Sequence, residues 1–156
     1  MRRKDREITE LARILDILDR CEVVRLGFCA AGLPYIVPMH FACTMANGAI
    51  SLFVHSAGDG RKIEMLRQND RVCFEADILH GIVPSPKACG WTAHYESVMG
   101  EGTAALVEDR AEKEAALVLL LRRYGLTEVA GMDAAAVERT AVLRVEVSAL
   151  SGKCNG

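Results

Sequence analysis

The stretch from Leu52 to Leu66, LFVHSAGDGRKIEML, contains the residues best suited to bind an anion. An apolar run ends at His55, a turn rich in Ser, Gly and Asp follows, and Arg61 and Lys62 then stand side by side where a helix pattern begins. Free backbone N–H groups at a helix start favour a phosphate, and the two cations would neutralise its charge. No complete P-loop or dinucleotide-binding fingerprint is present, so a solvated turn is the alternative.

The six cysteines do not have the spacing of a metal site or of a disulfide framework. No CxxC pair occurs, and most of the cysteines lie inside apolar segments, where we expect buried free thiols in a reducing compartment. Cys89 and His94 are two candidate ligands without a second pair, so packing is the better interpretation of both. We therefore expect no metal.

The composition favours a single globular domain over residues 1–156. Apolar residues make up 51% of the 156 residues, which is enough for a real core, and the formal net charge is −2. Basic residues cluster only in the opening MRRKDR, next to acidic ones, so no nucleic-acid partner is expected. No apolar run approaches the roughly 20 residues of a membrane span, and no signal-peptide core is present, so we expect a cytoplasmic protein without membrane contact.

The first half of the sequence predicts one helix and three strands. Thr9 is a candidate cap for a helix that ends before Cys21. The alternating EVVRLGFC is a strand, and YIVPMHFACT is a second one whose Pro38 indicates an edge, a bulge or a place where the sheet opens. The pair Asn47-Gly48 predicts a tight hairpin into a third strand, AISLFVH, so these three strands should form an antiparallel meander.

The second half predicts two more helices and three further strands. RKIEMLRQN is long enough for about two helical turns, and RVCFEAD returns as a strand. We expect ILHGIVPSPKACG to be a loop, because it carries two prolines and two glycines. A long strand from Trp91 to about Val107 should bend at Gly100–Gly102. Asp109 and Glu112 open a helix that ends at Gly125 and whose apolar face is Leu117, Leu120, Leu121 and Tyr124.

The last predicted strand lies in TAVLRVEVSAL, where apolar and polar residues alternate. Six strands, mostly antiparallel and interrupted by a few helices, favour a mainly β fold with accessory helices, a closed or split barrel. The absence of regular β-α-β alternation argues against a doubly wound sheet.

The order of motifs resembles one family along nearly the whole chain. The motifs that carry the resemblance are VVRLGFC, GLPYIVPMHF, ISLFVHSAGDGRKIEML, DRVCFEAD, YESVMGEGTAALVED and VLRVEVSALSGK. With these motifs the chain is similar to the pyridoxamine 5′-phosphate oxidase-like split barrels that bind FMN, and within them to the nitroimidazole-resistance branch. The resemblance implies a six-stranded antiparallel split β-barrel that acts as a homodimer with the cofactor at the subunit interface.

The resemblance also implies which residues hold the flavin. Lys62 matches the lysine that meets the flavin phosphate, and the strand PMHF matches the one along the isoalloxazine edge, with His40 where relatives often carry asparagine. The strand YESVMG matches one that approaches the ring from the partner subunit. The expected cofactor-binding residues are Arg25, Pro38, Met39, His40, Phe41, His55, Ser56, Ala57, Arg61, Lys62, Tyr95 and Ser97.

The function implied is a flavin-dependent oxidoreductase, nitroreductase-like activity being one candidate, that passes electrons or hydride from reduced FMN to a small-molecule acceptor. NAD(P)H is a candidate electron donor. His55 is the candidate proton donor, although it could equally hydrogen-bond the flavin, ligate haem or only cap its strand. The alternative function is a flavin- or haem-binding protein without catalysis, and FAD, haem and deazaflavin are alternatives to FMN.

Overall fold

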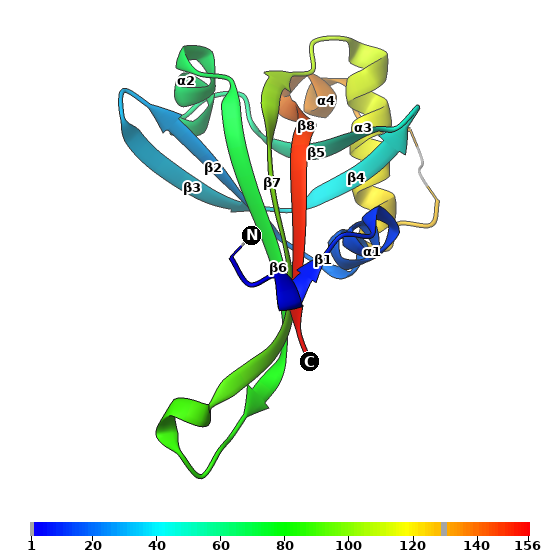
Figure 1. Cartoon of the computed structure of the whole chain (residues 1–156). Coiled ribbons are helices and arrows are strands. Elements are labelled where there is room, and N and C mark those ends of the chain that lie inside the picture. Colours follow the sequence, from blue (N-terminus) through cyan, green and yellow to red (C-terminus); the bar gives the residue numbers. More distant parts are fainter. Residues whose placement is uncertain (1, 129–130) are drawn as a thin grey trace.

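The computed structural model describes residues 2–128 and 131–156 (Figure 1). The strands are β1 (Glu7–Ile8), β2 (Val24–Ala30), β3 (Leu33–Met39), β4 (Phe41–Ala46), β5 (Ala49–Ala57), β6 (Arg71–Val83), β7 (Thr92–Leu106) and β8 (Thr140–Asn155). The helices are α1 (Leu11–Arg20), α2 (Arg61–Gln68), α3 (Arg110–Arg123) and α4 (Ala134–Arg139), with short 3-10 turns at Lys4–Arg6 and Ala88–Gly90.

The strands form one antiparallel sheet in the order β3-β2-β6-β7-β8-β5-β4, and β1 pairs with β8. The two edge strands, β3 and β4, follow each other in the sequence, so the chain crosses from one edge of the curled sheet to the other at His40. The sheet therefore curls into a barrel that stays split between these edges (Figure 1). The predicted split barrel is confirmed, with eight strands in place of six.

The predicted second strand is two strands that meet at His40. Pro38 lies on edge strand β3 opposite Arg25, where a missing N–H donor does not interrupt a ladder, as the sequence predicted. Beyond His40 the chain pairs with β5 instead of β2, so no meander of three consecutive strands forms. The hairpin at Asn47-Gly48 is confirmed, since both residues have the positive φ angles of a tight turn.

The first part of the predicted loop, residues 78–83, is strand and belongs to a long β-hairpin arm, whereas residues 84–90 form the tip, as a loop with a short 3-10 turn. Strands β6 and β7 stay paired as far as Val83 and Thr92, with one register shift between Leu79 and Gly81. The prediction failed because the prolines lie only beyond Val83, at the tip, and Gly81 follows the register shift without ending the ladder. Figure 1 shows this arm projecting away from the barrel.

Helix ends follow the local chemistry, with one exception. The Asp109 carboxylate accepts the Glu112 N–H at 2.8 Å, and Gly125 follows α3 with φ of 102°, so both predicted ends are confirmed. Thr9 was the wrong cap for α1, because the position before Leu11 is Glu10 and no side chain caps it. Helix α4 carried too weak a pattern to be predicted.

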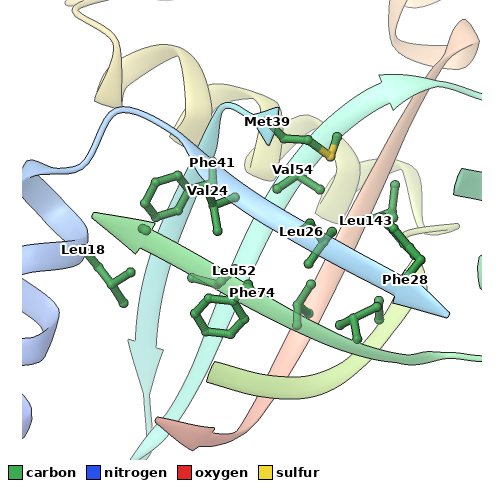
Figure 2. Close-up of a cluster of buried hydrophobic side chains, with 14 of the residues drawn as sticks. Leu18, Val24, Leu26, Phe28, Met39, Phe41, Leu52, Val54, Phe74 and Leu143 are labelled. Atoms are coloured by element: carbon green, nitrogen blue, oxygen red, sulfur yellow. The ribbon is translucent and has the colours of Figure 1, made fainter. Parts of the chain in front are cut away.

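The core fills the interior of the barrel, and helix α1 packs against one end of it (Figure 2). The bend predicted at Gly100–Gly102 is confirmed by a register shift between Glu101 and Gly102, where any Cβ would clash with the Glu146 carbonyl oxygen. The largest fully buried side chains include Leu18, Leu26, Phe28, Phe41, Leu52, Val54 and Leu143.

The six cysteines are free thiols, but the prediction that they are buried was wrong for half of them. Cys21 is buried, whereas Cys29, Cys73 and Cys89 are exposed, because the first two lie on the outer face of the sheet and the third at the tip of the arm. In the described part of the chain, no helix is long and apolar enough to cross a membrane.

Candidate functional site

A groove of about 410 Å³ opens where the chain crosses between the sheet edges. The end of β3, the end of β5 and the start of α2 meet there. It brings together seven of the predicted cofactor-binding residues, and its full lining is Val23, Val37, Pro38, Met39, His40, His55, Ser56, Ala57 and Lys62.

The start of α2 supplies the groove with positive potential. Gly60 precedes the helix with φ of 98° and ψ of 174°, a conformation open essentially to glycine alone, and no side chain caps the helix. The N–H groups of Ile63 and Glu64 bond to the Gly60 carbonyl, whereas those of Arg61 and Lys62 have no partner among the described residues. Since the half-buried Lys62 also lines the groove, backbone donors and one cation are available to an anion there.

The two predicted arginines lie elsewhere. The Arg61 guanidinium stacks over the Tyr35 ring, 4.5 Å from its centroid, and so lies against β3 instead of lining the groove. Arg25 pairs with Glu75 at 2.9 Å and with Asp77 at 2.6 Å on the outer face of the sheet. The structure therefore brings only Lys62 of the three predicted cations into the groove, and phosphate binding by the arginines stays a prediction.

Three other predicted residues also lie outside the groove of their own chain. Phe41 is fully buried in the core, with the Arg123 guanidinium 4.5 Å from its ring centroid. Tyr95 and Ser97 lie on β7, opposite Asn155 and Lys153 of β8, on the same outer face as Arg25. Their predicted approach to the ring from a partner subunit stays a prediction.

Two histidines, His40 and His55, line the groove, and both side chains are exposed. The His40 ring lies against the Tyr124 ring, with centroids 4.5 Å apart and planes tilted by 31°. Partial burial lowers the pKa of His55, and the neighbouring His40 lowers it further, even though one side of His55 is open to solvent. Neither imidazole bonds to another described residue, so both can serve a ligand. The lowered pKa favours the neutral form of His55.

Tyr124 is held in place by its hydroxyl, which donates to the Glu22 carbonyl at 2.6 Å and accepts the Phe41 N–H at 3.1 Å. The preceding Arg123 donates to the carbonyls of Leu18 and Cys21, each at 2.7 Å, and so joins the end of α3 to the end of α1. These hydrogen bonds of Arg123 and Tyr124 therefore fix the end of α3, against which the His40 ring lies.

A second pocket, of about 360 Å³, adjoins the groove and shares His40 and His55 with it. Helices α3 and α4 form its far side. The sequence had predicted the apolar face of α3 but not this pocket, because only the tertiary structure brings that face opposite the two histidines. The remaining lining residues are Leu117, Leu120, Leu121, Tyr124, Met132, Asp133, Ala136, Val137 and Thr140.

The groove offers different chemistry along its lining. Lys62 and the free amides of α2 suit a phosphate, while Val23, Val37 and Met39 offer apolar surface and the two imidazoles offer polar contacts at one end. Among the described residues, no group of three or more His, Cys, Asp or Glu side chains could hold a metal ion.

Comparison with known proteins agrees with the fold. At 30% identity and a TM-score of 0.80, the chain is similar to a proposed 5-nitroimidazole antibiotic resistance protein from Bacteroides thetaiotaomicron, with 94% of this chain and 85% of that one covered. A flavocytochrome from Azotobacter vinelandii has the same fold at 23% identity and a TM-score of 0.85, covering 100% of this chain and 72% of that one. A FAD and haem binding protein from Mycobacterium smegmatis also has this fold, at 20% identity and a TM-score of 0.83, with 96% of this chain and 73% of that one covered.

The comparison with curated proteins found no match. The sequence profile described as "Pyridoxamine 5'-phosphate oxidase", however, matches residues 10–154 and so spans nearly all of the chain. Together with the split barrel and the groove at its open seam, this match shows that the chain belongs to the pyridoxamine 5′-phosphate oxidase family.

Proposed function

We propose that the protein is a flavin-dependent oxidoreductase that binds FMN in the groove and reduces a small-molecule acceptor. The observation that carries the proposal is the meeting of Lys62, the uncapped start of α2 and the two histidines in one groove. A bound flavin supplies two-electron or one-electron transfer to the acceptor. The names of the similar proteins from Azotobacter and Mycobacterium, a flavocytochrome and a FAD and haem binding protein, support a flavin.

Each part of the groove has a defined task in this proposal. Lys62 and the α2 amides hold the phosphate, and Pro38 to His40 line the ring edge. Val23, Val37 and Met39 exclude water from the ring. The lowered pKa of the solvent-exposed His55 favours its neutral form, in which one ring nitrogen donates a hydrogen bond. His55 then relays a proton, since this nitrogen gives its proton to the acceptor while the other ring nitrogen takes one from solvent.

We also propose that the site is completed in a homodimer. The outer face of the sheet has a hollow of about 440 Å³ that Ile36 and Met99 line, and these two side chains are 66% and 59% exposed. Uncovered apolar surface of this kind favours a protein partner. Tyr95 and Ser97 lie on the same face, so a second copy packed there would bring them toward the other subunit's groove.

A second candidate function is haem binding without turnover. It is favoured by the two imidazoles that have no partner among the described residues, since a histidine nitrogen is a common axial ligand of haem iron. The names of two similar proteins, a flavocytochrome and a FAD and haem binding protein, agree with haem binding.

The absorption spectrum of the freshly purified protein separates these functions. We expect the flavin spectrum, and bleaching of the visible band when a reductant is added without oxygen. On mixing with a nitroarene, the band should return as the acceptor is reduced, and more slowly in His55→Gln. A Soret band without flavin would instead support haem binding. Reduced flavin that stays reduced with every acceptor tried would support a role without turnover.

A further inference from the structure

The apolar pocket beside α3 and α4 differs from the adjoining groove in the side chains that line it. Its lining includes three leucines of α3 together with Met132 and Val137, and none of the described residues that line it is a lysine or an arginine. Lys62 lines the groove but not this pocket, so a phosphate is accommodated on one side of the histidines only. An anion would lose its hydration in the pocket without gaining a counter-ion, and the carboxylate of Asp133, which lines the pocket, already caps α4.

Most polar groups of the pocket are already occupied. The Tyr124 hydroxyl bonds to Glu22 and Phe41, the Asp133 carboxylate accepts the Ala135 N–H at 2.9 Å, and the Thr140 hydroxyl donates to the Ala136 carbonyl at 2.8 Å. In the described part of the chain, the imidazoles of His40 and His55 are left without a hydrogen-bond partner. A ligand is therefore offered apolar walls and hydrogen-bonding groups at one end.

The volume limits the size of such a ligand. The 360 Å³ of the pocket is room for about a dozen non-hydrogen atoms, at roughly 30 Å³ for each water-sized group. Leu121 and Tyr124 are still 42% and 40% exposed, so the pocket has an open side through which a molecule of this size can enter.

From these observations we infer that this pocket is the binding site of the acceptor, and that the acceptor is a neutral, mainly apolar molecule of about a dozen non-hydrogen atoms whose polar end meets His40 and His55. Its role as an acceptor site rests on the proposed function, because the shared histidines bring it next to the groove. Its selectivity for a neutral apolar ligand rests on the lining alone.

The test compares two probes of equal heavy-atom count, 4-nitroacetophenone, which is neutral, and 4-nitrobenzoate, which is an anion. Equilibrium dialysis against the parent protein, with and without FMN, gives both affinities, and the imidazole NMR signals report where the probe lies. We expect the neutral probe to bind more tightly and to shift the signals of His40 and His55. Equal or tighter binding of the anion, or no binding of the neutral probe, would overturn the inference.

A matched pair of variants locates the site. Leu121→Asp places a charge at the pocket, whereas Leu11→Asp changes a leucine of the same exposure, 43% against 42%, on α1. We expect Leu121→Asp to weaken binding of 4-nitroacetophenone about tenfold, and Leu11→Asp and the FMN affinity of both variants to stay unchanged. Equal affinity of Leu121→Asp and parent for the neutral probe would show that the probe does not bind in this pocket. Because the probe is measured without FMN as well, failure of flavin binding would refute the proposed function separately.

Discussion

The rings of His40 and Tyr124 lie 4.5 Å apart, and this contact joins the point where the chain changes sheet edge to the end of α3. The Tyr124 hydroxyl bonds to the carbonyl of Glu22 and to the N–H of Phe41. These two residues are the sequence neighbours of Val23 and His40, which line the groove. The contact with the Tyr124 ring therefore fixes the His40 ring between the groove and the apolar pocket.

His55 should titrate below the ordinary histidine value. Burial and the neighbouring His40 both disfavour its protonated form, so its pKa in the folded protein is lowered. ¹H NMR titration of the Cε1 proton should give a midpoint below about 6.5. In His40→Asn, which removes the second cause, the midpoint should rise. A midpoint at or above the ordinary value in the parent would contradict this description of the site.

The lowered pKa of His55 also determines whether the protein gains or loses stability as the pH falls. Because the folded state disfavours the protonated imidazole, the contribution of His55 to stability is present above its unfolded pKa of about 6.5 and is lost as the pH falls through its lower folded pKa. The midpoint of urea unfolding should therefore depend less on pH in His55→Gln than in the parent between about pH 6.5 and 5. An identical pH dependence in both proteins would argue against the lowered pKa.

Arg123 should be one of the most important polar side chains for stability. It is 11% exposed, donates to the carbonyls of Leu18, Asp19 and Cys21, and stacks on Phe41. Arg123→Met would leave these carbonyls without their donor, so we expect a loss of about 3 kcal/mol in the free energy of unfolding measured with urea. The neighbouring Arg122→Met, at an exposed position, should change it by less than about 0.5 kcal/mol. Similar losses in the two variants would mean that the bonds of Arg123 are not stabilising.

A charge on the outer face should separate the proposed homodimer. Met99→Glu places a carboxylate in the apolar hollow, opposite Glu75 of β6. Met45→Glu is the control, because Met45 is 55% exposed on edge strand β4, away from that face. Light scattering should give a dimer for the parent and for Met45→Glu, and a monomer for Met99→Glu. A monomeric parent that binds FMN would refute completion of the site by a second copy.

Local sequence patterns predicted most of the elements but not their pairing. The Asn47-Gly48 turn and the Asp109 cap depend on neighbouring residues alone, so both were predictable. The change of sheet partner at His40 depends on contacts between distant segments, and no local pattern indicates it. The arm was missed for another reason, since two prolines at a hairpin tip resemble a proline-rich loop.

The candidate site shows the same limit. The turn before Lys62 suggested an anion site from residue types alone, and the groove now places that lysine beside His40 and His55. Sequence order could not show that Arg61 turns toward Tyr35 or that Arg25 is held by two carboxylates. Those contacts compete with a phosphate for the guanidinium groups, and they arise only when the sheet is formed.

The proposed flavin site depends most on Lys62 holding the phosphate, and the affinities of Lys62→Ala for FMN and for riboflavin test this role most directly. Loss of a charge-assisted hydrogen bond of about 1.5–3 kcal/mol should weaken FMN binding roughly tenfold to a hundredfold. Riboflavin, which lacks the phosphate, should bind equally to variant and parent. The control is Arg67→Ala, an exposed cation at the other end of α2, which should leave both affinities unchanged. Unchanged FMN affinity in Lys62→Ala, or an equal loss for riboflavin, would contradict a phosphate site at the start of α2.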